Sequence, residues 1–143
     1  MVTAVQQLPD LTAAAEPVVR NAEALERISP SQRDLLCELS YIYLACGQAD
    51  KALALIRLVV TCMPDDIGGL RVLAYALLAN GRGEEALAAV DRLAAMDNDR
   101  EARAPLLLLR SHALRLGGRT IEARRAFREF VAARSSLSNG DAT

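Results

Sequence analysis

The chain has 143 residues, a length that fits a single domain, and 52% of them are hydrophobic while 24% are charged. Alanine and leucine supply 26 and 23 residues, whereas there are only three tyrosines, two phenylalanines and no tryptophan. This composition favours helices and argues against an all-β fold, and a formal net charge of −1 gives no general attraction to nucleic acid.

The chain begins with an N-terminal extension, residues 1–30, which we expect to be partly helical. A helix is predicted from about Pro17 to Ile28, because proline suits the first turn of a helix. The segment SPSQ that follows predicts a linker into the main domain. That domain is expected over residues 31–135, and residues 136–143 are expected to form a flexible tail.

Six helices are predicted within the main domain, because apolar residues recur there at helical spacing. Their expected ranges are 31–45, 49–62, 66–79, 83–96, 101–116 and 120–134. Ser31, Asp66 and Thr120 are the candidate capping residues near helix starts.

An internal repeat sets the spacing of these helices. Gly47 and Gly81 are 34 residues apart, and Gly118 follows 37 residues later. A small residue lies in each preceding helix, and an alanine follows each glycine by five positions: Ser40, Ala74, Ser111, Ala52, Ala86 and Ala123. Because helix backbones approach closely only over small side chains, these positions predict helix crossings, and the glycines predict left-handed turns.

This pattern resembles the tetratricopeptide repeat, a helix–turn–helix unit of 34 residues. The first copy matches it most fully, at Leu39, Ser40, Tyr43, Gly47, Ala52 and Pro64. The resemblance implies an all-α protein, a right-handed α-solenoid of three such repeats with an N-terminal helical extension.

The residues that most enzymes and metal sites require are scarce. His112 is the single histidine, and the three cysteines form no CxxC pair. The acidic segment DNDREA lacks the turn glycine of a calcium loop and is interpreted as an ordinary loop. We therefore expect no enzyme activity, no metal and no cofactor. The sequence opens without a secretory signal and holds no membrane-length apolar run, so a cytoplasmic protein without membrane insertion is expected.

The first helix of each repeat is expected to line the concave side of the solenoid, where residues at i, i+4 and i+7 share a face. Three equivalent sets form the candidate partner-binding groove: Cys37, Tyr41 and Leu44; Arg71, Tyr75 and Leu78; and Leu108, His112 and Arg115. Tyrosine combines apolar area with a polar tip, which suits recognition. The alternative is that Tyr41 and Tyr75 only pack adjacent helices, and that His112 is an ordinary helix residue.

The last predicted helix carries Phe127, Phe130 and Val131 without a capping helix after it. Exposed apolar surface there favours a partner, or a homodimer when the protein is free. The arginines of this helix have three possible interpretations: a solvated helix face, contact with an acidic protein, or nucleic-acid binding. The interrupting Glu122 and Glu129 and the lack of an aromatic stacking surface argue against nucleic acid.

Over residues 35–134 the chain is similar to the Y-type (YscY/SctY) chaperones of bacterial type III secretion. The likeness includes Cys46–Gly47 at the first turn and the segment LLLLRSHALRLGGRTIEARRAFREFV near the end. It implies a cytoplasmic chaperone that binds a small secreted protein, the X-type protein, as a heterodimer and helps to engage the export gate. The alternatives are a translocator-type secretion chaperone and a general scaffold for protein–protein interaction.

Overall fold

The computed structural model describes residues 28–140, and this part of the chain folds into helices without any strand. The six helices are α2 (Pro30–Ala45), α3 (Ala49–Cys62), α4 (Ile67–Ala79), α5 (Gly83–Met96), α6 (Arg100–Leu116) and α7 (Thr120–Gly140). The all-α prediction is confirmed for these residues. The helix expected at 17–28 lies outside the described residues except for Ile28, which is not helical.

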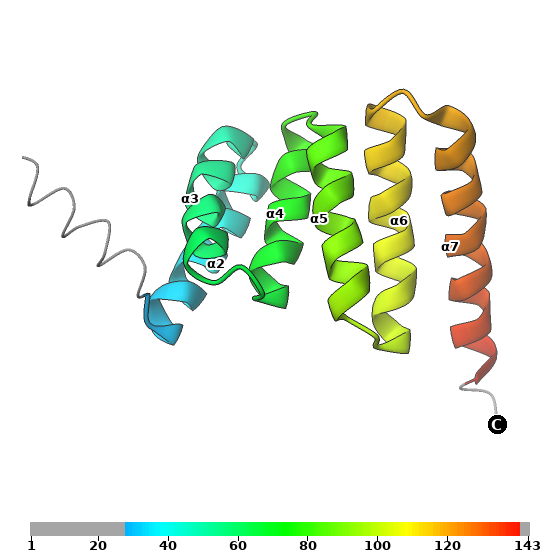
Figure 1. Ribbon diagram of the computed structural model, residues 1–143, viewed down its shortest axis with the longest axis horizontal. Coiled ribbons are helices and arrows are strands. Elements are labelled where there is room, and N and C mark those ends of the chain that lie inside the picture. Colours follow the sequence, from blue (N-terminus) through cyan, green and yellow to red (C-terminus); the bar gives the residue numbers. More distant parts are fainter. Residues whose placement is uncertain (1–27, 141–143) are drawn as a thin grey trace, which may run out of the picture.

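The helices follow one another in a row from α2 to α7 (Figure 1). Each helix packs against the next one in the chain, and α2 also contacts α4 while α4 contacts α6. The core between them is built from aliphatic side chains such as Ile56, Leu70 and Leu93, each with no exposed surface. None of the described helices combines the length and the apolar character needed to cross a lipid bilayer.

The predicted end of the last helix, near residue 134, is wrong. Helix α7 continues through a serine-rich segment to Gly140, so residues 136–140 of the expected flexible tail are helical. There the hydroxyls of Ser135, Ser136 and Ser138 donate hydrogen bonds to backbone carbonyls three or four residues earlier, at 2.8–3.0 Å. These bonds let the serines remain in a helix instead of ending it.

The three glycine turns are alike in detail. Gly47, Gly81 and Gly118 have φ angles of 73°, 71° and 77°, a left-handed conformation that favours glycine. At the first turn the amide of Gly47 donates to the carbonyl of Leu44, and the amide of Gln48 donates to that of Tyr43. The other two turns repeat both bonds, so each predicted left-handed turn is confirmed as a Schellman motif.

Polar side chains cap several helix starts. Ser29 caps α2, forming a capping box with Gln32, so the expected cap at Ser31 is wrong by two residues. Proline at position 30 explains the difference, because it occupies the first helical position and places the cap directly before it. The expected cap at Asp66 is confirmed, since its carboxylate accepts a hydrogen bond from the Gly69 amide at 2.6 Å.

The small residues lie where helices meet. Ala52 and Ala86 have no exposed surface, and Ala123 is 6% exposed. In the preceding helices, Ser40 and Ala74 are also completely buried. The Ser111 hydroxyl donates to the Ala123 carbonyl at 2.9 Å and so links α6 to α7.

Arg33 and Asp66 join the start of α2 to the start of α4. The guanidinium donates to both carboxylate oxygens at 2.8–3.0 Å, and both side chains are largely shielded from solvent. Hydrogen bonds to Asp66, and then to Asp34, raise the pKa of Arg33, which therefore stays charged at any accessible pH.

We expect Asp66→Asn to lower the free energy of unfolding by about 1 kcal/mol, because the amide can still cap α4 but cannot form the ion pair. The matched control is Asp65→Asn, because the Asp65 side chain is 90% exposed and lies 3.9 Å from Arg92. Urea denaturation of both variants measures the difference. Equal stability of the two variants would show that the partly buried Arg33–Asp66 ion pair contributes nothing.

Candidate protein-binding face

Two of the predicted groove residues form an aromatic pair. Tyr41 of α2 and Tyr75 of α4 have ring centroids 6.4 Å apart, with their planes tilted by 53°. Their side chains nevertheless remain 45% and 38% exposed, so neither ring is enclosed by the core. Burial, and then the neighbouring Tyr75 hydroxyl, raises the pKa of Tyr41. The tyrosine pair, Tyr41 and Tyr75, is thus a partly exposed aromatic surface that bridges two helices.

Three other predicted residues lie deeper. Leu44 and Leu78 are half-buried and pack against the core. Cys37 is 8% exposed, so its assignment to the groove surface is wrong and it belongs to the core. It lies on the side of α2 that packs inward, and burial raises the pKa of its thiol. Cys46, by contrast, is exposed.

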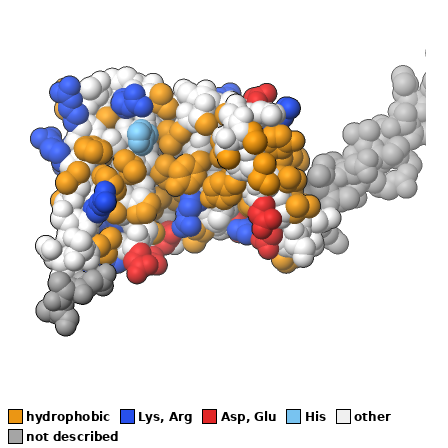
Figure 2. Space-filling model, turned by 180° about the vertical axis from the view of Figure 1, so that it is seen from behind, with side chains coloured by type: hydrophobic (Ala, Val, Ile, Leu, Met, Phe, Trp, Pro, Cys, Tyr) orange, Lys and Arg blue, Asp and Glu red, His pale blue; other side chains and the backbone are white. Residues whose placement is uncertain are grey.

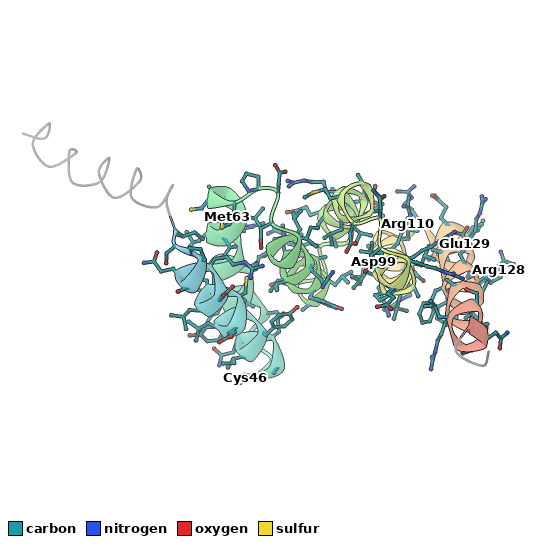
Figure 3. All side chains as sticks on the ribbon, turned by 90° about the horizontal axis from the view of Figure 1, so that it is seen from below. Cys46, Met63, Asp99, Arg110, Arg128 and Glu129 are labelled. Atoms are coloured by element: carbon teal, nitrogen blue, oxygen red, sulfur yellow. The ribbon has the colours of Figure 1, made fainter. Side chains whose placement is uncertain are left out.

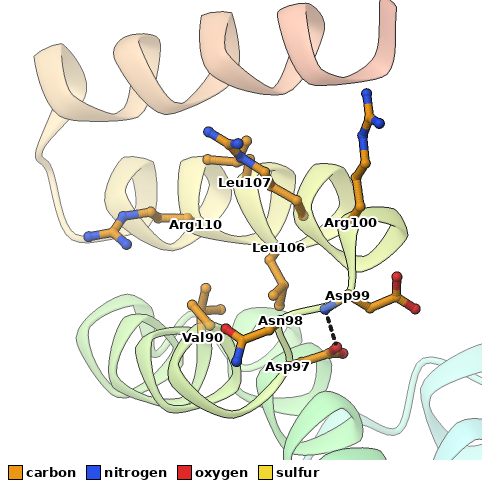
Figure 4. A pocket seen from close by; sticks show the side chains of 10 residues that line it. Val90, Asp97, Asn98, Asp99, Arg100, Leu106, Leu107 and Arg110 are labelled. Atoms are coloured by element: carbon orange, nitrogen blue, oxygen red, sulfur yellow. Dashed lines mark hydrogen bonds between the residues drawn. The ribbon is translucent and has the colours of Figure 1, made fainter. Parts of the chain in front are cut away.

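Arg71 is exposed, as a groove residue should be, but it forms an ion pair with a residue outside the predicted groove. Its guanidinium lies 3.3 Å from the Asp97 carboxylate, in the loop between α5 and α6. A cavity of about 450 Å³ opens beside this loop (Figure 4). Asp97 also accepts a hydrogen bond from the Asp99 amide at 3.2 Å, and Asp99 accepts one from the Glu101 amide at the start of α6. The DNDREA segment therefore serves as a loop and helix cap.

The predicted residues of α6 belong to a second group. His112 and Arg115 are exposed and line a cavity of about 770 Å³ between α6 and α7, while Leu108 is half-buried and does not line it. The structure therefore divides the predicted groove into the tyrosine pair on α2 and α4 and a separate cavity at the C-terminal end. Within residues 28–140, no group of three or more His, Cys, Asp or Glu side chains is placed to hold a metal ion.

The other wall of this C-terminal cavity was missed by the groove prediction. It comes from α7, through Ile121, Arg124, Phe127 and Arg128. The sequence contained a signal for this wall, because positions 121, 124 and 128 are spaced i, i+3 and i+7 and therefore lie on one side of a helix. The predicted groove was restricted to the first helix of each repeat, so it could not include residues of the last helix.

The C-terminal helix leaves apolar side chains exposed, as expected. Phe127 and Val131 are 48% and 47% exposed, whereas Phe130 is half-buried and contacts Phe127 with ring centroids 5.8 Å apart. Figure 2 shows the face that carries the single histidine, with a band of hydrophobic side chains beside it and basic side chains around it. This face can offer apolar contact and positive charge to one ligand.

No protein-family model matches the sequence, and a comparison with curated proteins finds no match. The function of this face is therefore inferred from its residues and from the resemblance described above.

Proposed function

We propose that the chain is a cytoplasmic chaperone of a bacterial type III secretion system. It binds a small secreted protein of the X type and keeps it soluble for export, with no enzymatic step. The observation that carries this proposal is the tyrosine pair, which stays exposed although its helices are firmly packed. Large aromatic side chains that remain at the surface of a well-packed protein are typical of binding sites.

The proposal includes a tetratricopeptide-type right-handed solenoid. Three equivalent Schellman turns, at Gly47, Gly81 and Gly118, support this arrangement, as do the buried small residues at equivalent positions. The contacts of α2 with α4 and of α4 with α6 support it as well, because these are the helices that would come first in successive repeats. In such a solenoid these helices line the concave side, where an amphipathic helix or an extended segment can be held.

The direct experiment is co-expression with the X-type protein of the same genome, followed by copurification. We expect the pair to elute as a heterodimer, with more soluble partner than when the partner is expressed alone. Failure of the X-type protein to copurify or to gain solubility would contradict the proposed function.

The double variant Tyr41→Ala/Tyr75→Ala should weaken binding of the X-type protein by roughly thirtyfold, or about 2 kcal/mol. The free energy of unfolding should fall by less than the free energy of binding. Both rings are partly exposed, and an aromatic pair contributes about 0.5–1.5 kcal/mol. Titration calorimetry measures the affinity, and thermal unfolding measures the stability.

Leu58→Ala is the control for this variant, because Leu58 is 40% exposed like the tyrosines but lies on α3, which carries neither of them. We expect it to leave binding unchanged. If the double variant keeps full affinity while its melting temperature falls sharply, the tyrosines serve packing and the groove is wrongly placed.

A further inference from the structure

Positive charge is concentrated in the last two helices. Residues 100–140 contain nine arginines and three glutamates, a local net charge of +6, whereas residues 28–99 have a net charge of −4. For the arginines of the last helix the sequence leaves three interpretations open, and the interrupting Glu122 and Glu129 argue only against nucleic acid. The structure shows where each of these charges lies and which of them form ion pairs.

The interrupting glutamates each have a partner. Glu122 accepts hydrogen bonds from Arg119 at 2.6 and 2.9 Å, and these bonds lower the pKa of the Glu122 carboxyl. Glu129 lies 3.4 Å from Arg125, one turn away on the same helix. Both glutamates line a cavity that shares no residue with the one containing His112. In Figure 3 the Arg110 and Glu129 side chains lie along the same edge of α6 and α7.

The cavity with His112 contains only positive charge. Arg115, Arg124 and Arg128 all line it, and no carboxylate within residues 28–140 forms an ion pair with any of them. We call this the cationic cavity; its defining residues are Arg115, Arg124, Arg128, His112, Ile121 and Phe127. Positive charges that line one cavity without a counter-charge repel one another, and an acidic ligand would relieve that repulsion.

Apolar side chains line the cavity together with these arginines. Ile121 is 83% exposed and Phe127 is 48% exposed, and both line the cationic cavity. A phosphate backbone would gain nothing from an aliphatic isoleucine, and the described residues that line the cavity form no row of aromatic rings on which bases could stack. A peptide segment with leucine-like residues on one face and carboxylates along its edge satisfies both features.

We propose that the cationic cavity binds an acidic amphipathic segment of the partner protein. This inference rests on the proposed function and extends it, because it specifies the chemistry of the segment that binds at the C-terminal end of the molecule. Carboxylates of the segment pair with Arg115, Arg124 and Arg128, while its apolar face covers Ile121 and Phe127. Guanidinium groups suit this role because their planar donors match carboxylate geometry.

The test uses two designed helical peptides with the same leucine face. One carries glutamates along the edge of that face, and the other carries glutamines at the same positions. Titration calorimetry at low salt should show the full-length protein binding the glutamate peptide about tenfold more tightly. High salt should reduce the difference, because exposed charges are screened.

The variants Arg115→Gln/Arg124→Gln and Arg110→Gln/Arg125→Gln form a matched pair. Each removes one arginine from α6 and one from α7, but only the first alters the cationic cavity. The preference for the glutamate peptide should disappear in the first variant and persist in the second. All four side chains are exposed, so thermal unfolding should show that both variants remain folded.

Several results would overturn the inference: no binding of either peptide, equal affinity for the two peptides, or equal losses in the two variants. Tighter binding of a single-stranded oligothymidine than of the glutamate peptide, through the same arginines, would assign the cavity to nucleic acid instead. If the peptides bind equally while the X-type protein still requires Tyr41 and Tyr75, the proposed function stands and only this inference fails. If the X-type protein does not bind at all, the proposed function fails.

Discussion

Ala86→Glu should unfold the protein or leave it largely unfolded. Ala86 lies on the side of α5 that faces the core and has no exposed surface. The substitution therefore places a longer, charged side chain where no partner can neutralise it. Burial of an unpaired charge costs about 3–5 kcal/mol, which is comparable to the whole stability of many small domains. Ala52→Glu in α3 should have the same effect, because Ala52 is equally buried.

The matched controls are Ala88→Glu and Ala54→Glu, which introduce the same side chain on the same two helices at exposed positions. Far-UV circular dichroism and urea denaturation should show that both controls resemble the wild type. If Ala86→Glu keeps its helicity and melting temperature, α5 does not pack through this alanine and the repeat alignment is wrong.

Gly83→Ala should lower the free energy of unfolding by about 1–3 kcal/mol. A Cβ atom at this position would lie 2.7 Å from both the Ala113 carbonyl oxygen and the Gly117 nitrogen, and 2.9 Å from the Leu116 Cβ. Two of these neighbours are backbone atoms near the end of α6, which cannot move aside like the tip of a side chain. The higher helix propensity of alanine offsets less than about 1 kcal/mol of this cost.

Gly140→Ala is the control, because a Cβ atom there meets nothing within 4 Å. Urea denaturation should separate the two substitutions, with a clear loss for Gly83→Ala and none for Gly140→Ala. A Gly83→Ala variant as stable as the wild type would mean that the start of α5 and the end of α6 are less close than the structure shows.

The repeat made much of this fold predictable. Gly47, Gly81 and Gly118 predicted three left-handed turns, and the small residues predicted the helix contacts, because each glycine has a small residue seven positions before it and an alanine five positions after it. Gly83 was not recognised as a packing residue. The equivalent position one repeat earlier is Ala49, so the repeat itself gives no sign that glycine is required there.

The candidate site was less predictable than the fold. Helical spacing identified Tyr41 and Tyr75 as neighbours, but it could not show that Cys37 turns into the core or that Arg71 pairs with Asp97. Those outcomes depend on how neighbouring helices are rotated and on where a loop crosses. Helical spacing places Arg124 and Arg128 on one side of α7, but only the packing of α7 against α6 shows that they share a cavity with His112.

The linear packing of the helices has a consequence for folding and local opening. Every substantial contact joins helices one or two steps apart along the chain, so contacting residues are close in sequence and folding should be fast. Helix α7 packs chiefly against α6, so it should exchange its amide hydrogens sooner than the central helices α4 and α5. A ligand held between α6 and α7 would slow that exchange selectively, so protection of α7 amides reports on occupancy at this end of the molecule.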